Sequence, residues 1–265
     1  MRYRSPKLAS LVLTIFFGAA LLAPLPYVVL TPGHAQNVLE KVITPAKTAP
    51  ESLKFYSSND KLYLLSILIT NPAAYVTGLE LIYSWARSDY SVMPRSLFYK
   101  PGRSADVEKK IAKTEMVDSQ IAAKTAALHF LKQNFPNSGA GAIQPSDIEI
   151  SLAKTGGPSG GLAFAIGIVE LLTPENILQG RSVATTGSID AQGKVGAIGG
   201  VAEKLLAAKK AGATLFLVPK DNCKDLAPNV AKIPEGIKVA AVGTLKEAIT
   251  ALNSKDPQGC ANLGA

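Results

Sequence analysis

The longest apolar stretch of the chain lies close to its start. Charged residues are absent from Leu8 to Leu30, whereas Arg2, Arg4 and Lys7 come before this stretch. About 20 apolar residues suffice to cross a bilayer as a helix, and positive charge before such a span predicts a cytoplasmic N-terminus. The pattern therefore predicts a cytoplasmic stub over residues 1–7 and a single-pass transmembrane anchor over residues 8–30. The rest of the chain is then expected outside the cytoplasmic membrane.

Two prolines, Pro24 and Pro26, interrupt the stretch and leave Leu8–Ala23 as its unbroken helical part. That length is also typical of a signal peptide, for which Gly18–Ala20 offers a cleavage site of small residues. A retained anchor and a cleaved signal both export the chain. A buried helix of a cytosolic protein is the third interpretation.

Strand and helix patterns alternate through the remainder of the chain, which predicts an α/β or α+β fold. It divides into a linker with a first strand (31–53), an N-terminal part (54–136), a core (137–253) and a tail (254–265), and the loop over 137–145 is its one compositional boundary. The periodicity predicts strands over 62–69, 148–152, 182–186, 214–218 and 239–242, a loop over 137–145, a hairpin around 190–193, and helices over 73–86, 160–172, 201–211 and 245–252, with two more inside 104–132.

Within the region 104–132, Ser104 is expected to cap the first helix. The second helix is expected to bury a stripe made of Val117, Ile121, Leu128 and Leu131. His129 lies beside this stripe and is interpreted as a packing residue.

Composition excludes several classes of protein. The 265 residues carry 28 Lys+Arg against 20 Asp+Glu, a net charge of +8, and three of these charges belong to the N-terminal stub. No basic run with interleaved aromatic residues follows, so no nucleic-acid partner is expected. The two His and two Cys are scattered, whereas a structural zinc site needs four clustered ligands. Neither a metal nor another cofactor is expected.

The two cysteines, Cys223 and Cys260, are disulfide candidates because thiols outside the cytosol tend to pair. Their bond would join the C-terminal tail to the body of the protein. Two unpaired thiols are the alternative.

A glycine-rich segment, Gly156–Gly161 (GGPSGG), stands between a predicted strand and an apolar helix. Its glycines allow a tight turn that leaves the Ser159 hydroxyl uncovered and places amide N–H groups at a helix N-terminus, where an oxyanion is stabilised. A phosphate loop requires a lysine after the last glycine, but Leu162 stands there. The segment also matches G-x-S-x-G, yet no histidine follows it, which argues against a Ser-His-Asp triad.

Two other interpretations compete for this region. Ser151–Lys154 and Lys154–Gly156 spell the S-x-x-K and K-T-G signatures of penicillin-binding proteins. These motifs lie far apart in that family but overlap here, which disfavours the interpretation. A tight turn without chemistry remains the structural alternative.

A lysine can activate the serine if burial keeps its amine neutral, because the pKa must fall from about 10.4 towards 7–8. Lys204 is the candidate, since helical periodicity places it with Leu205 and Ala208 on the apolar face of the predicted helix. The same periodicity places Glu203 and Lys210 on the opposite, solvent-facing side.

Three ordered motifs resemble the core of the Lon-type serine peptidases: Gly156–Gly161, Thr186–Val195 (TGSIDAQGKV) and Ile198–Ala208 (IGGVAEKLLAA). The sequences Pro26–Gly33 (PYVVLTPG) and Met116–Gln120 (MVDSQ) are similar to the membrane-anchored, ATP-independent YlbL-like branch of that family. The resemblance implies the Lon protease domain fold, which is similar to the second domain of ribosomal protein S-five.

By the resemblance, Ser159 is the nucleophile, Lys204 the general base and Thr186 the hydroxyl that orients the lysine. The backbone amides around Gly157 and Gly160 would form the oxyanion hole. The family also implies protein or peptide substrates, and its cores commonly assemble as rings, so a homo-oligomer is possible.

The sequence departs from the family in three respects. No Walker A motif occurs in the 265 residues, and too few residues lie between the helix that contains Met116 and Asp147 for the PDZ module of YlbL-like proteins. Gly156 stands where cytosolic Lon enzymes typically carry an acidic residue. We therefore expect an ATP-independent, membrane-anchored serine endopeptidase that acts on unfolded or flexible segments. A catalytically inactive binding or scaffold protein with the same fold is the alternative, and an acyltransferase is a third.

Overall fold

The computed structural model describes residues 7–51, 53–136, 139, 142–152, 155–226 and 234–260. The chain divides into two units, which we describe separately. The smaller unit consists of Met1–Thr31 and Leu68–Glu108, and the larger consists of Pro32–Ile67 and Lys109–Ala265.

The smaller unit begins with helix α1 (Lys7–Leu22), followed by the two-residue strand β1 (Pro24–Leu25) and the first part of strand β2 (Tyr27–Asn37). β1 pairs antiparallel with β5 (Val76–Thr77), and Tyr27–Leu30 pair antiparallel with β6 (Ser91–Pro94). A short 3-10 helix, η1, covers Arg95–Leu97. Helix α2 (Gly78–Trp85) lies between β5 and β6 in the chain.

Helix α2 starts later than residue 73, where the hydrophobic pattern predicted its beginning. Thr77 caps it, since the Thr77 hydroxyl accepts the N–H of Glu80 and the Glu80 carboxylate accepts the N–H of Thr77. This reciprocal capping box satisfies two backbone donors at the helix start. The pairing of Val76 and Thr77 with β1 holds the preceding residues in an extended conformation.

The predicted span over residues 8–30 is not one continuous helix. α1 ends at Leu22, and Tyr27–Leu30 belong to β2. Pro24 and Pro26 explain the break, because proline lacks the N–H that a continuing helix would need. Among the helices of the described residues, none combines the length and apolarity that a bilayer crossing requires.

The larger unit is built on a sheet in which β12 (Lys238–Val242), β11 (Leu215–Pro219), β8 (Ser182–Thr185), β4 (Lys61–Ile69) and β2 are neighbours in that order. The first four strands are parallel to one another. All five residues of β11 are buried, as expected for a parallel strand covered on both faces.

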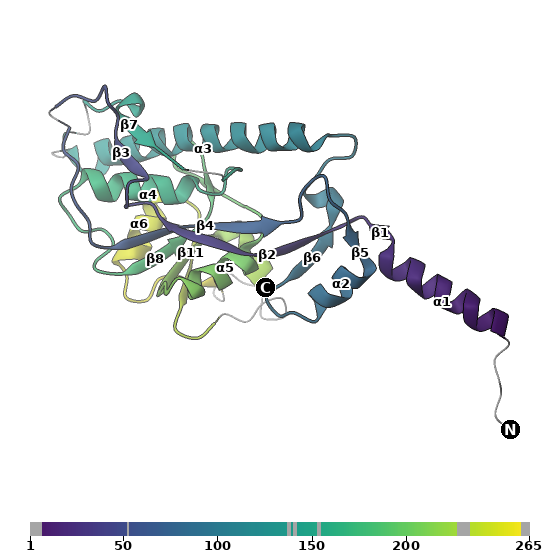
Figure 1. Ribbon diagram of the computed structural model, residues 1–265. Coiled ribbons are helices and arrows are strands. Elements are labelled where there is room, and N and C mark those ends of the chain that lie inside the picture. The colour runs from purple at the N-terminus through teal and green to yellow at the C-terminus, as the bar shows by residue number, and fades with distance from the viewer. Residues whose placement is uncertain are drawn as a thin grey trace. The chain divides into compact units, whose positions relative to one another are not determined.

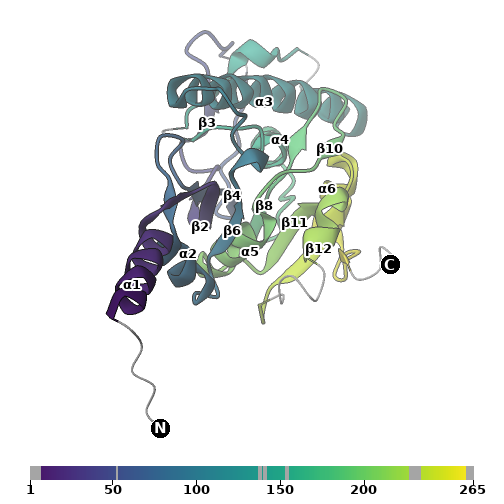
Figure 2. The same cartoon turned by 90° about the vertical axis from the view of Figure 1, so that its right-hand side faces the viewer.

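Helices cover both faces of this sheet (Figures 1 and 2). On one face, α3 (Ala105–Asn134), α4 (Gly161–Leu172) and α6 (Leu245–Asn253) share a core with Val183 and Leu217. On the other, α5 (Val201–Lys210) packs with Ala184 and Phe216. Because successive side chains of a strand alternate between the faces, each strand supplies both cores.

Short elements complete the larger unit. β3 (Ile43–Pro45) pairs with β7 (Ile148–Ile150), and β9 (Ser188–Ile189) forms the predicted hairpin with β10 (Val195–Gly196). Two 3-10 helices, η3 and η4, cover Pro145–Asp147 and Lys220–Leu226. The predicted loop over 137–145 falls partly outside the described residues.

One prediction for residues 104–132 was wrong, because a single helix, α3, replaces the two that were expected. No glycine or proline occurs between its ends to break it. Ser104 does accept a backbone hydrogen bond from Val107, at 3.3 Å.

The buried side of α3 also differs from the predicted stripe. Leu128 and Leu131 are buried as expected, but Val117 and Ile121 are exposed. His129 is exposed too, and one of its ring nitrogens lies 2.9 Å from the amide nitrogen of Gln133.

Cys223, in η4, and Cys260 are joined by a disulfide across 37 positions of sequence. Closing a loop of that length stabilises a fold by about 3–4 kcal/mol in the chain-entropy account. We expect Cys260→Ser to lower the free energy of unfolding by about that amount, measured by denaturant titration. Reduced wild-type protein should match the variant, and an unchanged midpoint after reduction would contradict the prediction.

Candidate active site

The glycine-rich segment forms a tight turn directly before α4, and Ser159 is partly exposed within it. Gly157 has φ +85°, a conformation that glycine adopts without strain. A Cβ at Gly160 would lie 2.6 Å from Leu64 Cδ1, so any side chain at this position would require the Leu64 side chain on β4 to move. These local demands explain why the sequence carries glycine on both sides of the serine.

Helix α3 holds the turn from the other side. The N–H of Gly157 donates to the carbonyl of Ala112 at 2.8 Å, and the buried Ser119 hydroxyl donates to the carbonyl of Pro158 at 2.9 Å. Ser119 lies in the MVDSQ motif but was not predicted as a site residue. A serine on the helix face that packs against the core was the available signal.

The amide of Gly157 is therefore committed to Ala112, which corrects the expectation that Gly157 contributes an oxyanion donor. The N–H of Gly161 donates to Pro158 at 3.3 Å. The N–H groups of Ser159 and Gly160 donate to no other residue in the described part of the chain. These two amides are the free donors beside the Ser159 hydroxyl.

We predict that Ser119→Ala lowers kcat about fivefold and leaves KM nearly unchanged, because one of the two donors to the Pro158 carbonyl is lost at a net cost of about 1 kcal/mol. Steady-state kinetics on an unfolded polypeptide measure the effect. Thr125→Ala is the matched control, since this exposed hydroxyl on the same helix bonds only to the carbonyl of Ile121. Equal kcat values for the two variants would contradict the positioning role.

The carbonyl of Ser159 is held by the segment that follows β8. It accepts the N–H of Gly187 at 3.0 Å and the hydroxyl of Thr186 at 3.3 Å. Thr186 is fully buried, and its own N–H donates to Leu217 of β11. Ser159 therefore lies at the carboxyl edge of the parallel strands, where ligands of open α/β sheets commonly bind.

Helix α5 starts at the same edge. A Cβ on Gly200, its N-cap, would lie 2.9 Å from Ile67 near the end of β4. Just before the helix, the Asn222 amide forms two hydrogen bonds with the backbone of Ile198, at 2.9 and 2.8 Å, and Asn222 follows the carboxyl end of β11. Lys204 lies one turn into this helix, and its N–H donates a hydrogen bond to the carbonyl of Gly200.

The Lys204 side chain is only 2% exposed. Burial lowers the pKa of its amine from the ordinary value to about 7, and the neighbouring Glu203 carboxylate acts in the opposite direction. Lys209 and Lys210 of the same helix are exposed. Burial thus singles out Lys204 as the lysine of α5 that can be neutral near physiological pH.

Glu203 is buried, contrary to the solvent-facing position predicted from helical periodicity. Its Oε2 atom would lie 3.4 Å from a Cβ on Gly200, so the side chain folds back toward the start of α5. The helix is buried over more of its surface than the apolar pattern indicated.

The Thr186 hydroxyl contacts the Ser159 side of the site. Ala184 contributes to the core under α5, and alternation along the strand directs Thr186, two residues later, to the same face. The Thr186 hydroxyl uses its proton for the Ser159 carbonyl, which leaves its lone pairs able to accept a hydrogen bond from a lysine amine.

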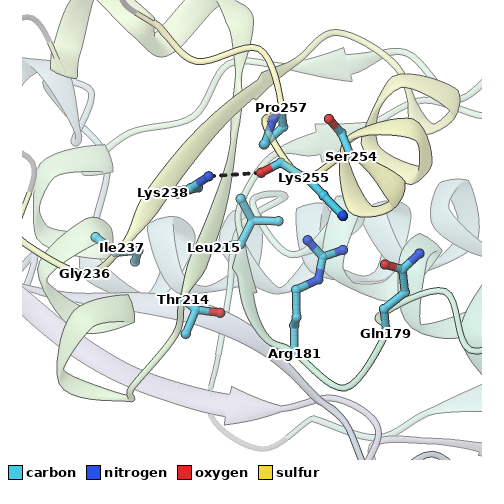
Figure 3. Close-up of a pocket in the computed structure, with 10 residues that line it drawn as sticks. All are labelled: Gln179, Arg181, Thr214, Leu215, Gly236, Ile237, Lys238, Ser254, Lys255 and Pro257. Atoms are coloured by element: carbon cyan, nitrogen blue, oxygen red, sulfur yellow. Dashed lines mark hydrogen bonds between the residues drawn. The ribbon is translucent and has the colours of Figure 1, made fainter.

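A separate pocket of about 560 Å³ lies at the opposite edge of the sheet, around the residues that begin β8, β11 and β12 (Figure 3). Arg181, Lys238 and Lys255 make it basic, and Lys238 Nζ donates to the carbonyl of Lys255 at 2.9 Å. It contains none of the predicted catalytic residues. In the described part of the chain, no cluster of His, Cys, Asp and Glu is able to hold a metal ion.

The glycine-rich turn with Ser159, the buried Lys204 and the mixed sheet together indicate a serine peptidase. Residues 102–254, more than half of the chain, match the family model of the Lon protease (S16) C-terminal proteolytic domain. The chain therefore belongs to this family and is a hydrolase of the serine peptidase class.

Individual relatives agree with the family match. The chain is 37% identical to the Lon protease of Haemophilus influenzae over 103 residues, which is 39% of this chain and 13% of that protein. It is 42% identical to the Lon protease of Azospirillum brasilense over 93 residues, 35% of this chain and 11% of that protein. For the Lon protease of Rickettsia typhi the values are 34% over 130 residues, 47% and 16%. The chain thus spans less than a fifth of the length of these curated relatives.

Proposed function

We propose that the chain is a serine endopeptidase in which Ser159 and Lys204 form a catalytic dyad. The burial of the Lys204 amine is the observation that carries the proposal, because an unprotonated lysine is a competent general base near neutral pH. The free amides of Ser159 and Gly160 supply donors for the oxyanion.

In the proposed reaction, the Ser159 hydroxyl attacks the peptide carbonyl carbon while its proton passes to Lys204 Nζ. Collapse of the tetrahedral intermediate breaks the C–N bond, and Lys204 returns the proton to the leaving amine. Water then attacks the acyl-enzyme and loses a proton to Lys204. As the ester C–O bond breaks, Lys204 returns this proton to Ser159 Oγ, and the carboxylic acid product is released. Thr186 accepts a hydrogen bond from Lys204, which turns the lone pair of the amine toward Ser159.

The proposed substrates are unfolded or flexible protein segments, cleaved without ATP, as the resemblance of PYVVLTPG and MVDSQ to the ATP-independent YlbL-like branch implies. We further propose that α1 attaches the enzyme to the cytoplasmic membrane and that the catalytic unit acts on the outer side. No residue of α1 is buried in the protein, which supports its attachment to a membrane. The Cys223–Cys260 disulfide suits an oxidising compartment, which supports a location outside the cytoplasm.

A serine-reactive fluorophosphonate probe tests the dyad. Wild-type protein should be labelled on Ser159, as located by mass spectrometry, in the absence of ATP. Ser159→Ala should not be labelled, and Lys204→Ala should be labelled far more slowly. Wild-type protein that resists the probe would favour a binding or scaffold protein, whereas labelling by a β-lactam would favour an acyltransferase.

A further inference from the structure

The smaller unit exposes a set of large apolar side chains around α2. We call the following five residues the α2 face: Tyr75, Leu79, Ile82, Tyr83 and Trp85. Each is more than half exposed, and Trp85 is 70% exposed. Leu79, Ile82 and Tyr83 follow the i, i+3, i+4 spacing that places side chains on one side of a helix. Soluble proteins seldom leave such a patch uncovered without a partner for it.

The α2 face is continuous with a second apolar surface of the same unit. A Cβ on Gly78, the first residue of α2, would lie 2.3 Å from the carbonyl oxygen of Ala20, so the last turn of α1 touches the start of α2. Except for the half-buried Leu21, the large apolar side chains of α1 are exposed: Leu8, Leu11, Val12, Leu13, Ile15, Phe16, Phe17 and Leu22.

The composition of the α2 face suits the boundary between lipid and water. Tryptophan and tyrosine concentrate at that boundary, because their rings are apolar while one edge forms hydrogen bonds. An arginine lies against one of these rings, since the Arg95 guanidinium is 5.0 Å from the ring centre of Tyr75, whereas Arg87 is paired with Asp89 at 3.1 Å. Cations at this depth attract anionic headgroups.

The length of α1 points to the same surface. Its 16 residues rise about 24 Å at 1.5 Å per residue, whereas the hydrocarbon core of a bilayer is about 30 Å thick. Apolar surface next to its C-terminal end would extend the contact with lipid.

We propose that the α2 face lies in the headgroup region of an anionic bilayer, beside the point where α1 leaves the lipid. This inference rests on the proposed membrane attachment by α1. It assigns the smaller unit a role as a second membrane contact, which fixes the unit at the bilayer surface instead of leaving it tethered by one helix.

Trp85 is the only tryptophan of the chain, so its fluorescence reports directly on this face. The full-length Ser159→Ala protein is mixed with vesicles of phosphatidylcholine and phosphatidylglycerol, and binding is measured by sedimentation. We expect a blue-shifted Trp85 emission, protection from iodide and quenching by brominated lipid. The double variant Leu79→Asp/Ile82→Asp should lose the shift and bind at least tenfold more weakly, because two aliphatic side chains no longer enter the lipid when the protein binds.

Ile121→Asp is the matched control, because Ile121 is as exposed as Ile82 but lies on α3 in the larger unit. It should bind vesicles like the parent protein. Sedimentation with vesicles while Trp85 stays open to iodide would overturn the inference and leave attachment by α1 standing. Absence of sedimentation would overturn both, and a blue shift without lipid that follows protein concentration would assign the face to a second copy of the chain instead.

Discussion

Replacing Lys204 by methionine is expected to lower kcat/KM for peptide hydrolysis by roughly four orders of magnitude or more, the scale on which loss of a catalytic dyad member is felt. The reason is that the described part of α5 offers no other buried amine, since Lys209 and Lys210 are exposed. Cleavage of an unfolded polypeptide without ATP measures the loss. Lys210→Met, on the same helix, should retain activity, and a Lys204→Met enzyme within tenfold of wild type would contradict the dyad.

The pH profile of the wild-type enzyme adds a second readout. Only the neutral amine can accept the serine proton, so kcat/KM should rise as pH increases through the Lys204 pKa of about 7. The Glu203 carboxylate raises that pKa, and Glu203→Gln should therefore move the rise to lower pH. A profile that does not move in Glu203→Gln would show that this carboxylate does not act on the base.

The same Lys204→Met substitution is expected to stabilise the fold while it removes activity. The pKa of Lys204 is about 7 in the folded protein, compared with about 10.4 in an unfolded chain, so the unfolded state binds the proton more tightly. Below pH 7 the folded protein must bury the charge, which costs about 3–5 kcal/mol. The cost shrinks as pH rises from 7 and vanishes above the unfolded pKa.

Thermal unfolding at several pH values measures this effect. The melting temperature of Lys204→Met should exceed that of wild type by about 10 °C near pH 6, since 1 kcal/mol corresponds to roughly 2–4 °C in a chain of this size. The difference should decrease steadily toward pH 10. A difference in melting temperature that does not change with pH would mean that methionine improves packing and that burial of the charged lysine does not destabilise the fold.

Local chemistry explains which parts of the site were predictable. Glycine and proline around Ser159 specify a tight turn whatever the rest of the chain does, and three ordered motifs identified the family. The position of Lys204 followed from the period of one helix, because an isolated lysine among apolar residues is a local signal.

The parts that were missed depend on contacts between distant segments. Glu203 is buried because the start of α5 packs against β4, and the periodicity of a single helix cannot predict contacts with a distant strand. Ser119 acquires its role only when α3 lies beside the catalytic turn, 39 positions further along the chain. Val117 and Ile121 form a regular apolar spacing, yet the helix turns another side toward the core. The break in the span over 8–30, in contrast, was predictable from Pro24 and Pro26, which leave Leu8–Ala23 as the unbroken part, and α1 ends at Leu22.

The close packing around the catalytic turn has a consequence for mutational tolerance and enzyme engineering. A methyl group at Gly160 would collide with Leu64, and one at Gly156 would lie 2.9 Å from the Ala112 side chain. Random mutagenesis should therefore yield few functional variants at Gly156 and Gly160, where an added side chain must displace Ala112 or Leu64, and at Gly157, where φ +85° strains any residue other than glycine.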